Sequence, residues 1–217
     1  MTVYDRKDHY HQRAKREGYR SRAAYKLLEI QRSQRLLRPG HRVIDLGCWP
    51  GGWLQVAAEA VGPKGRIVGV DLAAIDPPLE NENVIAFCAD LTQPSVIAEL
   101  IERLGGPADV VLSDAAPKLT GIRAVDQARE GALLEGVEAL LGGLLRAGGT
   151  LLVKILEGPD AVLVDRRLRG EFETAKTVKP AASRRGSSER YLLGRGYKGR
   201  SGPPMVRVDE RLGVDHE

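Results

Sequence analysis

The sequence predicts an α/β fold in which a mostly parallel sheet carries helices on both faces. Strand-like and helix-like patterns alternate along most of the 217 residues, as they do in βαβ units. A glycine turn interrupts the run Val43–Trp53, and acidic residues close several apolar runs. The length and the 42% hydrophobic content suit one domain with a sizeable core.

Residues 1–18 are polar, basic and weakly periodic, so we expect them to be loose. Ser21 is a candidate cap for a helix that runs to Gln34, and Pro39-Gly40 ends that segment. Helices are then expected at Gly52–Val61, Pro94–Leu104, Asp126–Arg146 and Pro159–Leu168. Parallel strands are expected at Arg42–Gly47, Arg66–Asp71, Val84–Cys88, Asp109–Ser113 and Thr150–Leu156.

The last two strand patterns, Phe172–Val178 and Arg190–Gly194, have no helix between them. They predict an antiparallel hairpin at the edge of a seven-stranded sheet. Residues 195–217 are rich in Gly, Pro and Arg and then acidic, which predicts a flexible tail.

Composition excludes several classes of protein. No apolar run reaches the roughly 18 residues of a membrane span, and the N-terminus lacks a hydrophobic signal core. Cys48 and Cys88 cannot build a disulfide framework and have no metal-ligand spacing with the histidines. We therefore expect two small buried cysteines in a reduced, cytoplasmic protein that binds no membrane and no metal.

The formal net charge of +4 conceals an uneven distribution. Residues 1–40 hold eleven Lys/Arg against four Asp/Glu, and residues 175–200 hold eight against one, so each segment carries +7. Residues 41–174 hold twelve against twenty, a net charge of −8. Basic segments at both ends of an acidic core attract phosphate backbones, although solvated, flexible termini would look the same.

The run Val43–Trp53 predicts a strand–turn–helix nucleotide site. Its glycine spacing is not G-x-G-x-x-G, so a dinucleotide pyrophosphate is not its natural ligand. The carboxylate of Asp45 at the strand end, with small residues behind it, suits a neutral or cationic nucleoside such as S-adenosylmethionine.

Acidic residues also end the next three strands, where ligands bind in doubly wound sheets. Asp71 can accept hydrogen bonds from ribose hydroxyls and would repel a 2′-phosphate. Asp90 can read an adenine edge, and Asp114 ends the fourth strand. One such aspartate is often only a turn or cap residue, but four in register with a glycine turn indicate a site.

Lys154 interrupts the apolar run Leu151–Leu156, which otherwise predicts a buried central strand. Lysine is rarely buried without a partner. It can extend its amine to solvent or pair with a core acid, or its pKa can be lowered so that it acts as a base. Its strand is expected beside the strand that ends at Asp114, which favours a functional role.

In order and spacing, several motifs make the chain resemble the FtsJ/RrmJ family of S-adenosylmethionine-dependent RNA ribose 2′-O-methyltransferases. The resemblance covers residues 5–194. It implies a Rossmann-like methyltransferase domain at residues 41–194, after a basic RNA-binding segment and helix at residues 1–40. The motifs are Ser21-Arg22-x-x-Tyr25-Lys26-Leu27, Asp45-Leu46-Gly47, Pro50-Gly51-Gly52-Trp53, Ser113-Asp114-x-Ala116-Pro117, Val153-Lys154 and Ser188-Glu189-x-Tyr191.

The length and basic ends are most similar to the bacterial branch, which methylates a uridine of large-subunit (23S) ribosomal RNA. The resemblance implies that the protein uses S-adenosylmethionine as its cofactor and ribosomal RNA within the large subunit as its substrate. It also implies that the protein is a monomer. Cys48-Trp49 departs from the small pair expected before Pro50, so Trp49 either reshapes the methionine end of the pocket or packs elsewhere. The implied catalytic residues are Lys26, Asp114, Lys154 and Glu189, and the implied cofactor contacts are Gly51, Trp53, Asp71, Asp90 and Asp114.

The four catalytic residues also make chemical sense. A ribose hydroxyl is a weak acid, so methyl transfer needs help with its proton and alignment of the attacking oxygen. Lys154 would take the proton or steer the oxygen lone pair, and Lys26 would stabilise developing negative charge. Asp114 would orient Lys154, and Glu189 would balance the charge. Lys26 would lower the pKa of Lys154, whereas Asp114 and Glu189 would raise it, so the direction of the net shift stays open.

The expected RNA surface combines the two basic segments. Tyr10, Tyr19 and Tyr25 interleave with the first segment and can stack on bases, although Tyr25 could equally pack its helix onto the sheet. The basic residues are Arg6, Lys7, Arg13, Lys15, Arg16, Arg20, Arg22, Lys179, Arg184, Arg185 and Arg190.

Three alternative functions remain open. The chain could methylate tRNA or another RNA, act as a catalytically silent RNA-binding assembly factor, or be a nicotinamide oxidoreductase, which the glycine spacing disfavours. Enzymes that methylate exocyclic amines carry Asn/Asp-Pro-Pro-aromatic where this chain has Asp114–Pro117. Cytosine-C5 enzymes need a cysteine near that loop, and neither cysteine is there.

Overall fold

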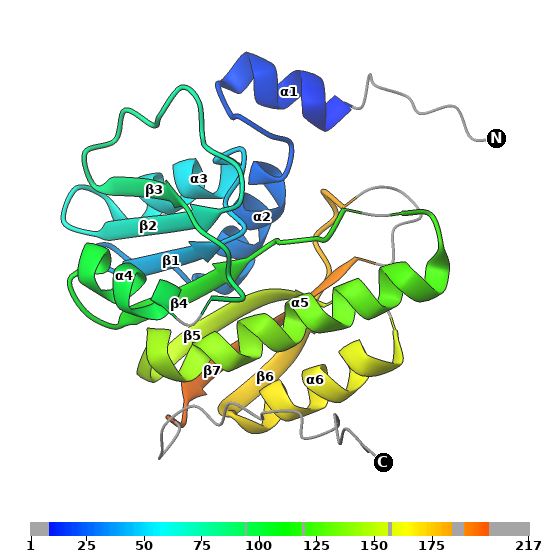
Figure 1. Ribbon diagram of the computed structural model, residues 1–217. Coiled ribbons are helices and arrows are strands. Elements are labelled where there is room, and N and C mark those ends of the chain that lie inside the picture. The colour runs from blue at the N-terminus through cyan, green and yellow to red at the C-terminus, as the bar shows by residue number, and fades with distance from the viewer. Residues whose placement is uncertain (1–8, 94, 119, 156–157, 184–188, 200–217) are drawn as a thin grey trace, which may run out of the picture.

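The computed structural model describes residues 9–93, 95–118, 120–155, 158–183 and 189–199. Within these residues, seven strands form one sheet in the order β3-β2-β1-β4-β5-β7-β6 (Figure 1). The first five strands pair in parallel, and β7 is antiparallel to both β5 and β6. The predicted α/β fold with an antiparallel edge hairpin is therefore confirmed, with β7 between β5 and the edge strand β6.

The elements agree with most of the predicted ranges. The strands are β1 (Arg42–Leu46), β2 (Arg66–Asp71), β3 (Val84–Cys88), β4 (Ala108–Ser113), β5 (Leu145–Ile155), β6 (Phe172–Val178) and β7 (Arg190–Tyr197). The helices are α1 (His9–Glu17), α2 (Ala24–Gln34), α3 (Gly52–Val61), α4 (Ser95–Leu104), α5 (Arg123–Leu144) and α6 (Pro159–Gly170).

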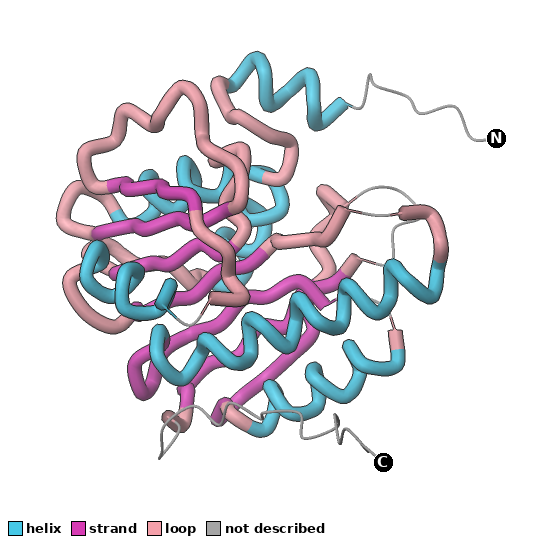
Figure 2. Tube along the Cα trace, in the orientation of Figure 1, coloured by secondary structure: helices cyan, strands magenta, loops and turns pink. Residues whose placement is uncertain are grey.

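Helices cover both faces of the sheet (Figures 1 and 2). α4, α5 and α6 pack on one face and α2 and α3 on the other, each over its own apolar core. Successive strand residues point to opposite faces, so Ile44 belongs to the first core and Val43 to the second. This alternation also determines which face the polar side chains at the strand ends occupy.

Two expectations for the N-terminal segment were wrong. Residues 9–17 form α1, because its middle packs Ala14 against Tyr25 of α2. Ser21 does not cap α2, which begins three residues later and has no side-chain cap. Its hydroxyl instead lies against Gly52, where a Cβ atom would be 2.4 Å from Oγ, and its carbonyl accepts the Ala24 amide.

Other elements run past their predicted ends. α5 begins at Arg123 because Asp126 accepts the Thr120 and Gly121 amides and organises the turn before it. α5 then passes directly into β5, five residues earlier than expected. β7 extends through Tyr197, whose ring packs 5.4 Å from that of Phe172. Residues 195–197 thus belong to the sheet, so the prediction of a flexible tail was wrong there, and residues 200–217 lie outside the described residues.

The two cysteines differ. Cys48 is buried as expected, whereas Cys88 is exposed and that expectation was wrong. Cys88 ends β3, an edge strand whose residues are half-buried or exposed. In the part of the chain that the structure describes, no helix is both long and apolar enough to cross a membrane.

Candidate active site

The strand order reverses between β1 and β4, and a cavity of about 700 Å³ opens at the carboxyl ends of the strands. This is the position at which doubly wound sheets bind ligands. Three of the predicted cofactor residues, Asp71, Asp90 and Asp114, line it. The remaining lining residues are Gly47, Trp49, Leu72, Ala73, Ala89, Leu91, Thr92, Ala115, Ala116, Pro117, Lys118, Arg129, Ala132 and Leu133.

The loops after β1 and β4 approach each other closely at Gly47. Its φ of +81° favours glycine, and a Cβ atom there would lie 2.5 Å from the Cβ atom of Ala115. A larger residue would push the two loops apart. The glycine of the Asp45-Leu46-Gly47 motif therefore shapes the floor of the cavity.

Asp71 organises the rim of the cavity. Its two carboxylate oxygens accept the amides of Trp49 and Ala73, each at 3.0 Å, so it joins the loops after β1 and β2. Each oxygen keeps a second lone-pair direction for a ligand hydroxyl. Asp90 is exposed on the same rim, and its hydrogen bonds from Thr92 lower the pKa of its carboxyl group.

Two predicted cofactor residues lie outside the cavity lining. Gly51 precedes α3 with a φ of 105°, and its nearest neighbours are the side chains of Arg20, Ile75 and Leu79. Trp53 is buried, and its Nε1 donates to the carbonyl of Ala23 at 2.8 Å. The side chain of Trp53 thus fastens α3 to the start of α2, and its role toward a cofactor stays a prediction.

For Trp49 we expected one of two positions, at the methionine end of the pocket or packed elsewhere. The structure places its side chain on the cavity wall with 58% of its surface exposed. An indole there offers a flat apolar surface to whatever the cavity holds. The alternative in which Trp49 packs away from the pocket was therefore wrong, and its contact with the methionine end of a cofactor stays a prediction.

Asp45 is a feature that sequence reasoning noted at a strand end but left out of the predicted site. It is 1% exposed, and its Oδ2 atom has no hydrogen-bond partner among the described residues. Burial, and then the negative charges of Asp114 and Asp71, raise the pKa of Asp45 well above its ordinary value. Burial beside two cavity acids therefore favours the protonated form of Asp45.

The four predicted catalytic residues come together because of strand periodicity and strand direction. Asp114 and Lys154 lie two residues beyond Leu112 and Leu152, which face the α2 side of the sheet. β7 runs antiparallel, so Glu189, just before it, lies at the edge where the parallel strands end. Lys26 reaches the same point from α2.

Lys26, Asp114, Lys154 and Glu189 form one charge cluster, hereafter the tetrad. The Nζ atom of Lys26 lies 2.6 Å from Glu189 Oε1 and 3.3 Å from Asp114 Oδ2. The Nζ atom of Lys154 lies 3.3 Å from Asp114 Oδ1 and 3.3 Å from Glu189 Oε1. The four side chains are only 10–15% exposed, so each carboxylate is shared by two nearly buried ammonium groups.

The tetrad determines whether the pKa of Lys154 lies above or below its ordinary value, which the sequence left open. Burial lowers the pKa of Lys154, but the charges of Asp114 and Glu189 outweigh burial, so its pKa lies above the ordinary value. Burial likewise raises the pKa of Glu189, and the hydrogen bond and charge of Lys26 reverse this and lower it. Of the roles that the sequence left open for Lys154, a base with a lowered pKa does not fit this arrangement, and Lys154 carries its proton at neutral pH.

Tyr191 joins the tetrad, a contact that sequence reasoning missed. Its hydroxyl donates to Asp114 Oδ1 at 2.7 Å. Burial, reinforced by the charges of Asp114 and Glu189, raises the pKa of Tyr191, so the hydroxyl stays protonated. The Ser188-Glu189-x-Tyr191 motif was the available signal, because Tyr191 pairs with Lys154 across β5 and β7.

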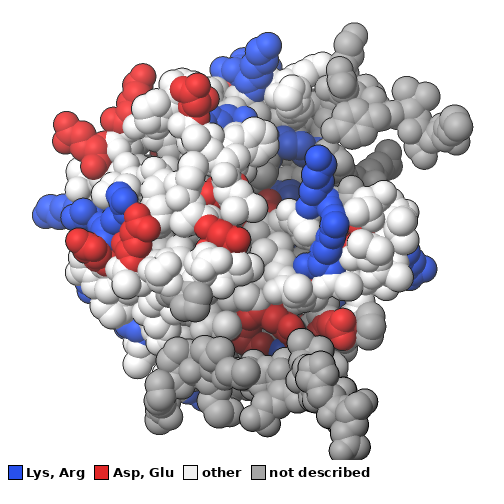
Figure 3. All heavy atoms as spheres, viewed as in Figure 1, with Lys and Arg blue, Asp and Glu red and all other residues white. Residues whose placement is uncertain are grey.

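The expected RNA surface is only partly free. Arg20 and Arg22 donate to the carbonyls of Pro78 and Ala182. Tyr25 is buried against Ala14 of α1 and Ala182, so the alternative in which it packs α2 onto the sheet was wrong. Figure 3 shows basic side chains on α1 and over the first half of α5. Lys15, Arg16, Lys179 and Arg190 are exposed, whereas Arg6, Lys7, Arg184 and Arg185 lie outside the described residues.

Comparison with known proteins identifies the family of this chain. The family described as FtsJ-like methyltransferase matches residues 19–197. The chain is 46% identical over 195 residues to ribosomal RNA large subunit methyltransferase E of Methanothermobacter thermautotrophicus, covering 90% of this chain and 92% of that one. It is 43% identical over 193 residues to the Pseudomonas aeruginosa protein of the same name, with 88% and 92% covered.

Solved structures show the same fold. A Plasmodium falciparum structure described as a ribosomal RNA methyltransferase superposes with a TM-score of 0.72 and 30% identity, covering 84% of this chain and all of that one. Fibrillarin from Aeropyrum pernix, solved with bound S-adenosylmethionine, superposes with a TM-score of 0.57 at 19% identity, covering 81% and 75%. The fold is thus Rossmann-like, and by its motifs and its relatives the chain belongs to the FtsJ-like methyltransferase family.

Proposed function

We propose that this protein transfers a methyl group from S-adenosylmethionine to the ribose 2′-hydroxyl of a uridine in large-subunit ribosomal RNA. The observation that carries the proposal is the tetrad, which places two ammonium groups and two carboxylates beside the strand-end cavity. The names of the relatives favour ribosomal RNA over tRNA. A silent binding protein would not need Lys154 nearly buried in this arrangement.

The cavity residues fit the proposed cofactor. The cavity-lining carboxylates of Asp71, Asp90 and Asp114 suit a ligand with a positive charge, and Asp71 has lone pairs for ribose hydroxyls. Apolar side chains, among them Trp49 and Leu91, suit a flat base. Bound there, S-adenosylmethionine supplies a methyl group already activated by its sulfonium charge.

The tetrad acts on the attacking hydroxyl. Because Lys154 holds its proton, its ammonium group donates to one lone pair of the 2′-oxygen and leaves another directed at the methyl carbon. Asp114 and Glu189 hold Lys154 in place, and Lys26 neutralises the second half of their charge. The hydroxyl proton leaves as the C–O bond forms, and water or these carboxylates accept it.

This steering role makes a prediction about pH. The raised pKa of Lys154 keeps it charged below pH 10, so the single-turnover rate of methyl transfer should change by less than about threefold between pH 7 and pH 9. A general base with that pKa would instead accelerate the reaction about tenfold per pH unit over this range. Quenched-flow transfer of tritiated methyl groups measures the rate.

The variant Lys154→Arg separates the two roles further, because arginine keeps the charge but cannot give up its proton. If Lys154 orients the 2′-oxygen, Lys154→Arg should keep some activity, and its rate should also stay nearly constant between pH 7 and pH 9. A steep rise with pH in the wild-type protein that disappears in Lys154→Arg would make Lys154 the general base and contradict steering.

The substrate is tested by offering tritiated S-adenosylmethionine with intact large subunits, free ribosomal RNA and tRNA in parallel. We expect label in the ribosomal RNA, with the 2′-O-methyl group mapped to one uridine. Label in tRNA alone would refute the proposed substrate. The same comparison decides whether the enzyme acts on naked RNA or on the assembled subunit.

Three further expectations belong to this proposal. Residues 1–40 serve as the RNA-binding segment of the methyltransferase domain, which spans residues 41–194 and gains residues 195–197 from the extended β7. The enzyme acts as a monomer. It works in the cytoplasm, where ribosomal subunits are assembled.

A further inference from the structure

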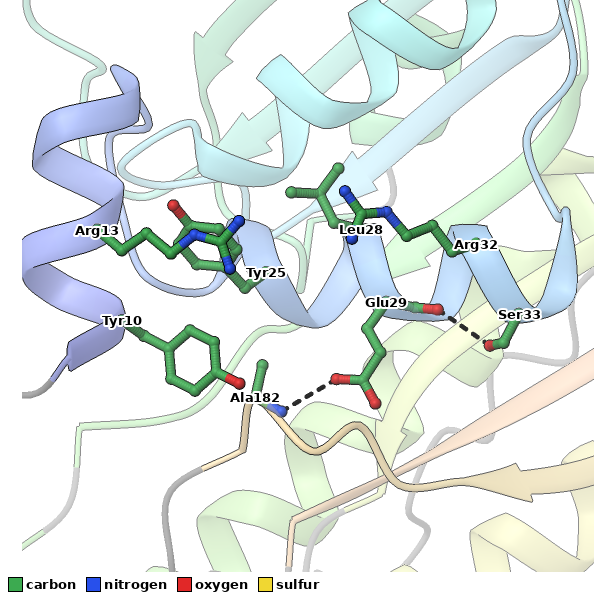
Figure 4. Close-up of a pocket in the computed structure, with 8 residues that line it drawn as sticks. All are labelled: Tyr10, Arg13, Tyr25, Leu28, Glu29, Arg32, Ser33 and Ala182. Atoms are coloured by element: carbon green, nitrogen blue, oxygen red, sulfur yellow. Dashed lines mark hydrogen bonds between the residues drawn. The ribbon is translucent and has the colours of Figure 1, made fainter.

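A second cavity, of about 390 Å³, lies between α1, α2 and the loop before β7 (Figure 4). Its volume is at the lower end of the range of small-molecule sites, so it suits one group of modest size. No part of the proposed reaction uses it. It is lined by Tyr10, Arg13, Tyr25, Leu28, Glu29, Arg32, Ser33 and Ala182.

One face of α2 forms the floor of this cavity. Its lining residues there follow the spacing i, i+3, i+4, i+7 and i+8 from Tyr25 to Ser33, which is a single helical stripe. Tyr25 is followed directly by Lys26 of the tetrad. The cavity and the tetrad therefore lie within one turn of α2 of each other, which is close enough for one RNA strand to contact both.

The cavity brings the two basic segments of the chain together. The carboxylate of Glu29 accepts the amides of Ala181 and Ala182 at 2.8 and 3.1 Å, and Arg22 donates to the carbonyl of Ala182 at 2.8 Å. Residues 1–40 and 175–200 each carry a net charge of +7. The cavity lies where these segments meet, and its lining holds Arg13 and Arg32 against Glu29.

The walls are already held in place by interactions of their own. The hydroxyl of Tyr25 donates to Glu17 at 2.9 Å, and the guanidinium of Arg13 lies 4.7 Å from the centre of the Tyr25 ring. Glu29 is likewise occupied by the loop amides. These interactions give the cavity its shape.

Two side chains on either side of the cavity are suited to recognition (Figure 4). Tyr10 is half-buried and extends from α1 toward Ala182. Its ring lies 5.4 Å from that of Tyr25, and the Arg22 guanidinium lies 5.7 Å from its centre, so Tyr10 is held in place at the cavity wall. Arg32 is exposed, and within the described residues it makes no hydrogen bond or ion pair. An aromatic ring and an uncommitted guanidinium are the groups that proteins use for a base and its phosphate in single-stranded RNA.

We propose that this cavity binds one unpaired nucleotide of the RNA substrate, near the nucleotide that is methylated. The base stacks on Tyr10 and a phosphate pairs with Arg32. The inference rests on the proposed function, since it names a subsite for the same RNA. An acidic peptide is less suited, because a carboxylate has no flat face for Tyr10.

The test uses the full-length protein and a single-stranded RNA pentamer that carries one 2-aminopurine, whose fluorescence is quenched on stacking. Tyr10→Ala should weaken binding about tenfold and remove the quenching. Arg32→Gln should weaken it about fivefold and reduce the slope of log affinity against log salt by about one. Arg166→Gln, which removes an exposed arginine from distant α6, should change affinity by less than about twofold.

Folding and function are checked on the same samples. Thermal unfolding and calorimetry with S-adenosylmethionine should be unchanged in Arg32→Gln, and Tyr10→Phe should bind the pentamer like the wild type because it keeps the ring. Wild-type affinity and quenching in both Tyr10→Ala and Arg32→Gln would overturn the subsite. Equal competition by a decapeptide of aspartate would overturn it in favour of an acidic peptide.

The outcome also separates the subsite from the proposed function. If the wild type methylates ribosomal RNA and the cavity variants bind the pentamer normally, only the subsite is wrong. If the variants lose binding but the wild type transfers no methyl group to any RNA, the subsite stands and the proposed function is wrong.

Discussion

Lys154→Ala is expected to reduce the single-turnover rate of methyl transfer about a thousandfold, the usual cost of losing a group that positions or stabilises a reacting oxygen. The ammonium group of Lys154 lies 3.3 Å from both Asp114 and Glu189. Without it the 2′-oxygen has no donor to orient it, and two carboxylates face the site with Lys26 alone.

The control for this variant is binding. Calorimetry with S-adenosylmethionine and gel-shift titration with ribosomal RNA should give affinities within about twofold of the wild type, because the cavity lining does not include Lys154. Lys64→Ala, at an exposed turn, should retain full activity. Unchanged methylation by Lys154→Ala, in the presence of normal RNA binding, would show that catalysis by the tetrad is the wrong interpretation.

Asp114→Asn is expected to lower the free energy of unfolding by about 3 kcal/mol as well as to abolish activity. Asp114 is the acceptor shared by Lys26, Lys154 and the Tyr191 hydroxyl. With an amide in its place, two nearly buried ammonium groups share only Glu189. Urea unfolding followed by circular dichroism measures the loss.

A double variant distinguishes stability from catalysis. Lys154→Met removes one ammonium group without emptying its volume, so Asp114→Asn/Lys154→Met should recover about half of the lost stability and none of the activity. If the losses of stability simply add, the carboxylate and the ammonium are not coupled and the tetrad does not behave as one charge cluster.

The sequence predicted the sheet, its switch point and the edge hairpin because these depend on local patterns. Apolar runs, turn residues and acidic strand ends are all visible along the chain. The alternation of strands and helices then leaves few topologies. The motif positions also identified the tetrad, although its members lie as far apart as Lys26 and Glu189.

Local reasoning failed where tertiary contacts determine the outcome. Residues 9–17 are almost entirely polar, so their helical periodicity is easily missed, and α1 packs Ala14 against Tyr25. Ser21 looks like a helix cap, but the close approach of Gly52 places it in the turn before α2. In both cases a contact between segments distant in the chain outweighs a weak local preference.

Residue type and spacing were thus enough to identify the α/β fold, the family resemblance and the residues expected to act. The charge state of Lys154 needed the structure, because it depends on how burial compares with two carboxylates at 3.3 Å. The structure was also needed to find the Oδ2 atom of Asp45, unpartnered among the described residues, and the cavity between α1 and α2. Electrostatic energies and cavities depend on distances in space, and a sequence specifies those distances only once the chain has folded.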